Sequence, residues 1–166
     1  MNDTRKIGAI GEEAAENHLK NSKYLILATN YQSGTGECAG EIDIVAWKDD
    51  CLVFAEVKTR SSNLYGEPMD AVDIRKMKAL VRTAAAFEND FVKNGRIYAY
   101  VPFLFFKLRK RLKIKDRRHD IIEVLLSRDG KIESIKQHEN AFTAATPKRL
   151  EKYRKRERNR FRSNRQ

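Results

Sequence analysis

The chain has 166 residues, of which 41% are hydrophobic and 34% charged, enough to bury the core of one globular domain and too few for two. Its longest nearly apolar run, residues 97–106, is interrupted by Pro102 and is shorter than the roughly 18 residues of a membrane-spanning helix. The net charge of +11 favours a polyanionic partner, and the first residues lack the apolar segment of a secretory signal, so we expect a cytoplasmic protein that does not bind membranes.

Residues 4–20 are predicted to form a helix, because small and apolar side chains recur on one side at about 100° per residue. Glu12 falls at the edge of that face, whereas the neighbouring acidic residues point further toward solvent. Residues 23–32 are typical of a strand, and residues 33–40 of a flexible connection rich in turn-forming residues.

Two apolar, β-branched runs follow at residues 41–48 and 51–58, and the Asp49-Asp50 pair between them predicts a hairpin with a two-residue turn. Side chains alternate between the two faces of a strand, so this register places four charged residues on one face. They form two opposed pairs, Asp43 with Glu56 and Glu41 with Lys58.

Opposed carboxylates repel, and burying them unpaired is costly, so the charges of Asp43 and Glu56 must be offset. A divalent cation would offset them, because Mg²⁺ and Mn²⁺ accept hard oxygen ligands. Lys58 would then orient a water or stabilise charge on a phosphate, an arrangement that suits phosphodiester hydrolysis. The alternative, which the residues leave open, is a purely structural salt-bridge network that includes Lys58 and Glu41.

The second half of the chain begins with a predicted loop at residues 61–68 and the longest predicted helix at residues 70–93. Residues 97–115 fit two structures, because apolar and basic side chains alternate as in a strand while leucines repeat every four residues as in a helix. We favour a helix at the start of this segment, since Pro102 suits a helix N-terminus.

Two further strands are predicted around Arg128-Asp129-Gly130, where Asp-Gly is a strong hairpin signal. After Pro147 we expect a frayed helix or disorder. Most of the positive charge lies in two short segments: residues 107–118 hold eight Lys and Arg against one Asp, and residues 147–166 hold ten against two Glu. A solvated surface is the alternative for either run, but two such runs beside an acidic site favour nucleic acid, with DNA as the expected partner.

Five short motifs resemble those of the uncharacterised YraN-like family, a branch of the PD-(D/E)xK nuclease superfamily related to archaeal Holliday-junction resolvases. They are GAIGEEAA at residues 8–15, GEIDIVA at 40–46, VFAEVKTR at 53–60, AVDIRKMKAL at 71–80 and, more weakly, RHDIIEV at 118–124. His119 stands where the family usually has Phe, and residues 97–117 look like an insertion.

The resemblance implies an α/β fold, a restriction-endonuclease-like mixed central sheet flanked by helices, over residues 1–145, followed by a basic tail at 146–166. It implies a catalytic set of Lys58, Glu12, Asp43 and Glu56. It also implies a metal site for Mg²⁺ or Mn²⁺ built from Asp43, Glu56, the Val57 backbone carbonyl and Glu12. Nucleic-acid contacts are expected from Lys76, Arg60, Arg109 and Arg111, although Lys76 fits a surface lysine and Arg60 a surface salt bridge equally well.

We therefore expect divalent-metal-dependent cleavage of DNA, with branched or single-stranded DNA suggested by kinship alone. The first alternative is a non-catalytic nucleic-acid-binding protein of the same fold, and the second is a basic-tailed interaction protein whose carboxylates are structural. His119, Trp47 and Tyr65 are interpreted as packing residues rather than substrate contacts. The sequence leaves the oligomeric state open, a homodimer included.

Overall fold

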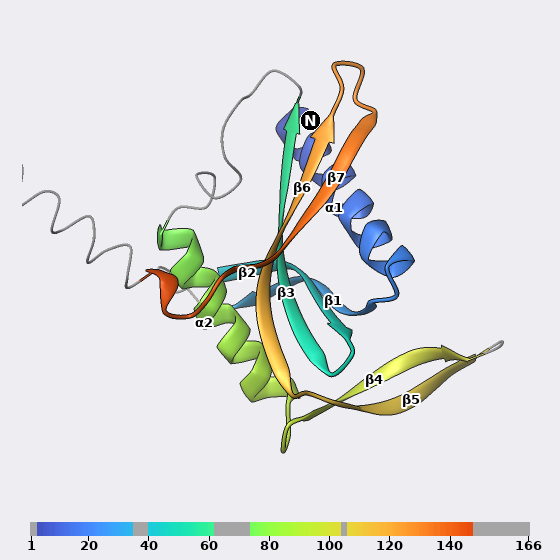
Figure 1. Ribbon diagram of the computed structural model, residues 1–166, viewed down its shortest axis with the longest axis vertical. Helices are drawn as coiled ribbons and strands as arrows, with labels where there is room; N and C mark the ends of the chain where they lie inside the picture. Colours follow the sequence, from blue (N-terminus) through green and yellow to red (C-terminus); the bar gives the residue numbers. More distant parts are fainter. Residues whose placement is uncertain (1–2, 35–39, 62–73, 104–105, 148–166) are drawn as a thin grey trace, which may run out of the picture.

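The computed structural model describes residues 3–34, 40–61, 74–103 and 106–147 (Figure 1). A five-stranded sheet with the order β1-β2-β3-β6-β7 is flanked by two helices, and β4 pairs with β5 in a separate hairpin. The elements are α1 (Asp3–Asn21), β1 (Leu25–Ser33), β2 (Gly40–Lys48), β3 (Cys51–Ser61), α2 (Ile74–Phe91), β4 (Arg96–Phe103), β5 (Phe106–Lys113), β6 (Asp116–Leu126) and β7 (Ile132–Phe142). In the five-stranded sheet β3 and β6 run parallel and the other neighbours run antiparallel. The predicted mixed sheet of a restriction-endonuclease-like fold is thus confirmed.

Several predicted features lie outside the described residues. These are residues 62–68 of the loop predicted at 61–68, the start of the helix expected from Asp70, Tyr65, and the tail after residue 147. The predicted helix at 4–20 and the strand at 23–32 are confirmed as α1 and β1. The Asp-Gly hairpin signal is confirmed too, since Gly130 has a φ of +78° between β6 and β7.

The β2–β3 hairpin has the predicted two-residue turn. Asp49 and Asp50 both have positive φ, 50° and 63°, which is the conformation of the type I′ turn that joins twisted antiparallel strands. The ladder of paired residues runs from Lys48↔Cys51 to Ile44↔Ala55, in the register that the sequence predicts.

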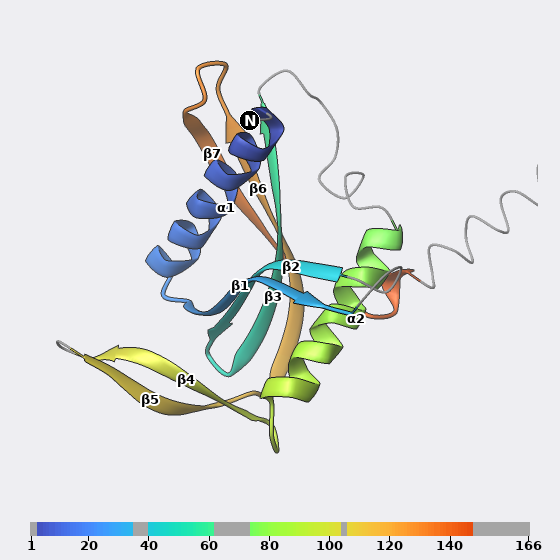
Figure 2. The same ribbon diagram turned by 180° about the vertical axis from the view of Figure 1, so that it is seen from behind.

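Both faces of the sheet are buried, and each is covered by one helix (Figure 2). The α2 side contains Val45, Leu52, Phe54, Met77, Leu80 and Phe87. The α1 side contains Ala15, Leu19, Ile44, Val53, Ala55 and Ile122. Ile42 departs from the predicted alternation, because it packs on the α2 side although Ile44 packs on the α1 side.

The segment at 97–115 corrects the sequence analysis: the helix favoured at its start is wrong, and the chain forms the β4–β5 hairpin. Ile97 and Leu112 are a buried pair, whereas Tyr98 and its partner Arg111 are exposed, so burial alternates with period two. A leucine repeat of four residues is also a multiple of two and therefore fits one face of a strand as well as a helix. Within the described part of the chain, no helix has the length and hydropathy to cross a membrane.

Candidate active site at the end of the β2–β3 ladder

The first helix approaches β3 closely at Gly11, on whose position the candidate site depends. A Cβ at Gly11 would lie 1.8 Å from Oγ1 and 2.9 Å from Cβ of Thr59, so only glycine allows this contact. The contact fixes the next residue, half-buried Glu12, beside the strand that carries Glu56 and Lys58. The close approach of α1 to β3 thus explains the second glycine of the GAIGEEAA motif, Gly11.

Asp43 lies one residue beyond the last pair of the β2–β3 ladder. Its Oδ2 accepts a hydrogen bond of 2.6 Å from the backbone N–H of Val57. Past this point β2 runs toward α2 while β3 continues beside β6 (Figure 1). The Asp43 side chain therefore takes up a backbone donor on β3 where the two strands separate.

Glu56 is the most buried acidic group of the site, with 2% of its surface exposed. Its Oε1 lies 2.6 Å from Nζ of Lys58, on the same strand, and its Oε2 lies 3.3 Å from Nζ of Lys76, on α2. Oε2 is nevertheless without a hydrogen bond of acceptable geometry among the described residues. The Lys76 contact is therefore an ion pair without a hydrogen bond, and Oε2 of this buried carboxylate can still accept a further partner.

The pKa of Asp43 is shifted by burial and by the other charged groups of the site. Burial, followed by the charge of Glu56, raises the pKa of Asp43 to about 7, and the charge of Glu12 adds to the rise. The Val57 N–H and the ammonium of Lys76 act in the opposite direction. A carboxyl group with a pKa near neutrality marks a place where negative charge is under-compensated, and such groups cluster at functional sites.

The donors present fit a hard divalent cation. Asp43 and Glu56 offer carboxylate oxygens only, one of them buried without a hydrogen-bond partner, and Mg²⁺ and Mn²⁺ prefer such oxygens. In the described ranges no set of three or more His, Cys, Asp or Glu side chains is close enough to hold an ion. Glu12 therefore acts here through its charge, and its role as a water-mediated ligand, like that of the Val57 carbonyl, stays a prediction.

The candidate nucleic-acid contacts fall in three separate places. Lys76 belongs to the acidic site itself, a role that the sequence missed because the link between α2 and β3 is long-range. Arg60 lies 3.5 Å from Glu123 of the parallel neighbour β6, as the salt-bridge alternative expects. Arg109 and Arg111 lie on the β4–β5 hairpin, where the guanidinium of Arg109 stands 4.3 Å from the ring centroid of Tyr98.

Two of the three residues interpreted as packing residues, His119 and Trp47, pack against apolar neighbours, and the third, Tyr65, lies outside the described residues. His119 lies between the rings of Phe54 and Phe142, with centroids 5.6 and 4.9 Å away, and burial lowers the pKa of its imidazole to about 4. Trp47 packs against the α2-side core and donates its indole N–H to the Lys113 carbonyl at 2.8 Å.

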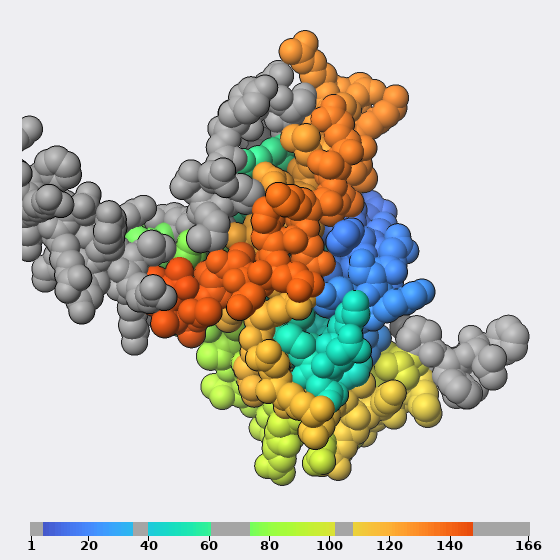
Figure 3. Space-filling model, viewed as in Figure 1, coloured from blue at the N-terminus to red at the C-terminus, as the bar shows by residue number. Residues whose placement is uncertain are grey.

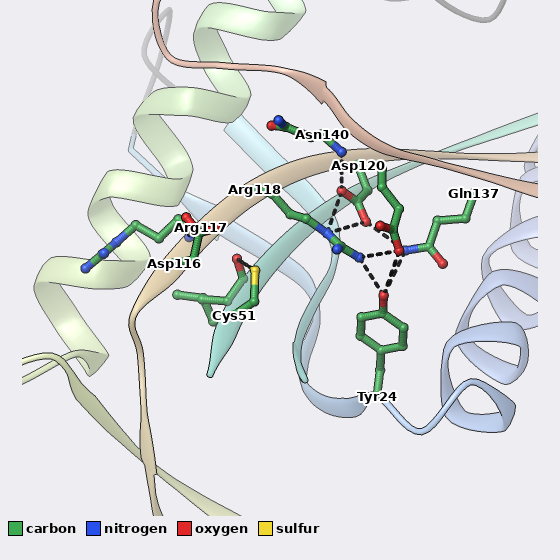
Figure 4. Close-up of polar contacts among 10 residues, drawn as sticks. Tyr24, Cys51, Asp116, Arg117, Arg118, Asp120, Gln137 and Asn140 are labelled. Carbon is green, nitrogen blue, oxygen red and sulfur yellow. Dashed lines mark hydrogen bonds and ion pairs between the residues drawn. The ribbon is translucent and has the colours of Figure 1, made fainter. Parts of the chain in front are cut away.

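A second polar cluster, which no motif of the sequence predicted, lies on the α1 side around Asp120 (Figure 4). Asp120 is completely buried and accepts hydrogen bonds from Arg118 Nε at 3.1 Å, Gln137 Nε2 at 2.7 Å and the Asn140 N–H at 2.9 Å. Arg118 also contacts the Tyr24 hydroxyl. Every oxygen of this carboxylate is satisfied within the protein, in contrast to Glu56, so the cluster ties β7 and the start of β1 to β6 rather than offering a site.

Comparison with known proteins matches residues 11–124 to a family described as "Uncharacterised protein family UPF0102", a span that contains Glu12, Asp43, Glu56 and Lys58. A relative from Clostridium botulinum is 35% identical over 138 residues, which cover 83% of this chain and 94% of the relative. A relative from Clostridium acetobutylicum is 36% identical over the same shares of both chains. One from Alkaliphilus oremlandii is 46% identical over 83 residues, covering 50% of this chain and 68% of the relative. All three carry only the name UPF0102 protein, which states no activity.

Proposed function

The chain belongs to the uncharacterised protein family UPF0102, and from that premise and the geometry of the acidic site we propose that it is a divalent-metal-dependent endonuclease that hydrolyses phosphodiester bonds in DNA. The proposal is carried by one observation: the buried carboxylate of Glu56, one oxygen of which has no hydrogen bond among the described residues, lies beside Asp43, whose pKa it helps to raise to about 7. Two carboxylates held close together in a largely buried site repel each other, and a hard cation would offset the negative charge that Lys58 and Lys76 leave uncompensated.

In the proposed reaction Asp43 and Glu56 would hold Mg²⁺ or Mn²⁺, with the Val57 carbonyl and Glu12 as the further ligands that the PD-(D/E)xK resemblance implies. The ion supplies Lewis-acid polarisation of the phosphate and lowers the pKa of an attacking water. Lys58 is held by Glu56 at 2.6 Å, which keeps its ammonium next to the carboxylates and able to orient that water. Lys76 balances the second oxygen of Glu56 and is within reach of a phosphate bound at the site.

The charge of the whole chain supports a polyanionic substrate. The net charge is +11, and the tail at residues 147–166 holds ten Lys and Arg against two Glu. Contacts from such residues to phosphates bind nucleic acid without reading its sequence. An acidic site in a chain of high net positive charge therefore favours hydrolysis of a phosphodiester over chemistry on a cationic substrate.

A cleavage screen tests the proposal. Duplex, single-stranded, flap and four-way-junction DNA are incubated with the full chain in Mg²⁺ or Mn²⁺, and products are resolved on denaturing gels. We expect cleavage of at least one form, a loss of at least about 100-fold in Lys58→Ala, and no cleavage by Glu56→Ala, which also reports contaminating nuclease. Equal cleavage by wild type and both variants, or cleavage by none of them, would contradict the proposal.

A non-catalytic nucleic-acid-binding protein is the second candidate, and one observation favours it. Lys58 and Lys76 together contact both oxygens of Glu56, so this carboxylate has counterions without a metal. Isothermal titration with Mn²⁺ separates the two candidates. The endonuclease requires Mn²⁺ binding that disappears in Asp43→Ala, whereas the binding protein requires DNA binding that survives Asp43→Ala with no metal uptake.

A further inference from the structure

The β4–β5 hairpin projects from the sheet beyond the β2–β3 turn (Figures 1 and 3). One of its faces is basic and aromatic. Residues 96–113 contain no acidic residue. The register puts six side chains on one face, in the opposed pairs Arg96↔Lys113, Tyr98↔Arg111 and Tyr100↔Arg109. All six are exposed, so this face, the Arg-Tyr face, presents four cations and two phenol rings to solvent.

The opposite face of the hairpin explains why the Arg-Tyr face points outward. Ile97, Ala99 and Leu112 belong to the α2-side core, with exposures of 4%, 9% and 2%. Trp47 ties the base of the hairpin to the sheet through the Lys113 carbonyl. Because the apolar face packs into the core, the Arg-Tyr face is turned away from that core, and Tyr98 and Tyr100 stay largely exposed.

The two tyrosines are arranged for stacking. Tyr98 and Tyr100 are 53% and 65% exposed and are separated by about 6.8 Å along one side of β4, as residues i and i+2 of a strand are. The guanidinium carbon of Arg109 stands 4.3 Å from the centroid of the Tyr98 ring, so this cation lies against one face of the ring. Tyr100 also lines a hollow of about 730 Å³ shared with Glu16, Lys20 and Lys23, in which Glu16 and Lys20 form an ion pair.

We propose that the Arg-Tyr face of the β4–β5 hairpin binds single-stranded DNA, with its arginines and lysine on the phosphates and Tyr98 and Tyr100 stacked on bases. This deepens the proposed function by naming the substrate class and rests on it only for the link between binding and cleavage. Exposed rings beside cations favour a single strand, because its bases present their faces, whereas the bases of a duplex are stacked on each other. A duplex would leave both rings without a partner.

The test measures binding without cleavage. The full chain is titrated in EDTA against a fluorescein-labelled oligothymidylate of about twenty nucleotides and followed by fluorescence anisotropy over a salt series. Tyr98→Ala and Tyr100→Ala are each expected to weaken binding by about fivefold or more, while Tyr98→Phe/Tyr100→Phe keeps the affinity of wild type. Arg109→Ala/Arg111→Ala is expected to reduce the slope of log K against log salt by about 1.4, or 0.7 for each lost phosphate contact.

The matched control is Lys131→Ala/Lys136→Ala, which removes the same charge from exposed positions at and near β7. The inference is overturned if the hairpin variants bind like wild type, if the control weakens binding as much as they do, or if a duplex of equal length competes as well as the single strand. If the hairpin variants lose binding but the wild type shows no metal-dependent cleavage, the endonuclease proposal is wrong and this inference stands. If the wild type cleaves DNA but the hairpin variants bind like wild type, this inference is wrong and the endonuclease proposal stands.

Discussion

Nζ of Lys76 on α2 lies 3.3 Å from Oε2 of Glu56 on β3, so the long helix supplies a cation to the most buried carboxylate of the candidate site. Lys58 reaches the other oxygen of the same carboxylate at 2.6 Å. The two lysines differ in exposure, with 40% of the Lys76 side chain and 26% of the Lys58 side chain accessible. Lys76 is therefore the one that a bound ion or phosphate can displace at lower cost.

Lys76→Met should tighten Mn²⁺ binding, because it removes a cation that competes with the metal for Glu56 while keeping the alkyl stem. The gain is expected to be severalfold, as the loss of one partly exposed charge is worth up to about 1 kcal/mol. Isothermal titration at constant salt measures it, with Lys78→Met as the control on the same helix. A weaker Mn²⁺ affinity in Lys76→Met would show that Lys76 supports the ion rather than competing with it.

Asp43→Asn should stabilise the protein at alkaline pH. The folded pKa of about 7 lies above the ordinary value of 3.8, so folding favours the protonated form. The free energy of unfolding of the wild type therefore falls as pH rises from about 4 to 7, and the whole penalty is present above pH 7. Asparagine does not titrate, and its amide oxygen can still accept the Val57 N–H.

Urea denaturation in EDTA checks this at two pH values. At pH 8 the variant should be more stable than the wild type by up to roughly 4 kcal/mol, and the difference should shrink toward pH 4. A difference that stays constant from pH 4 to 8 would show that the carboxyl group is not destabilised by its surroundings.

The hairpin carrying the acidic site was predictable because its signals are local. Period-two alternation and a two-residue turn fix which residues face each other, and the structure has that register from Lys48↔Cys51 to Ile44↔Ala55. The next step was not predictable: past Ile44 the strands separate, and Asp43 bonds to the Val57 N–H instead of continuing the ladder. The point at which the strands separate depends on how α2 packs against β2, and local sequence patterns do not predict this long-range contact.

Long-range contacts account for what the sequence missed elsewhere. Lys76 and Glu56 are far apart along the chain, so their ion pair follows from helix packing and not from spacing. The segment at 97–115 was misjudged for a different reason, since a leucine repeat of four satisfies both periods. The buried face of Ile97, Ala99 and Leu112 resolves the ambiguity only once the core is present.

His119→Phe should remove a loss of stability in acid. Burial lowers the pKa of the imidazole from 6.5 to about 4, so the unfolded chain binds a proton more readily than the folded one. The stability that the buried neutral imidazole contributes is fully present above pH 6.5. As pH falls from 6.5 to 4, the free energy of unfolding decreases by up to roughly 3 kcal/mol. A phenyl ring fits the same stack between Phe54 and Phe142.

The measurement compares free energies of unfolding at pH 7.5 and 4.5 for wild type and His119→Phe. The variant should lose less stability than the wild type over this interval, and His18→Gln serves as the control for removing a histidine elsewhere. An identical loss in wild type and His119→Phe would mean that water reaches His119 in the folded protein.

Gly11→Ala and Gly8→Ala form a matched pair that separates helix propensity from the contact holding Glu12 in place. Both glycines lie in α1, where alanine is intrinsically better by about 1 kcal/mol. A Cβ at Gly8 has nothing within 4 Å, so Gly8→Ala should raise the free energy of unfolding. A Cβ at Gly11 meets Oγ1, Cβ and Cγ2 of Thr59 at 1.8, 2.9 and 3.0 Å, and rotation of Thr59 cannot clear all three.

Gly11→Ala should therefore destabilise the protein by about 1–3 kcal/mol, the usual cost of overpacking, and displace Glu12 from β3. Thermal denaturation gives the stability, and the double variant Gly11→Ala/Thr59→Ser, which removes the Cγ2 methyl, should recover part of the loss. If Gly11→Ala were as stable as Gly8→Ala, the approach of α1 to β3 would be looser than the structure has it. The position of Glu12 relative to Asp43 would then not be fixed, and neither would the effect of its charge on the pKa of Asp43.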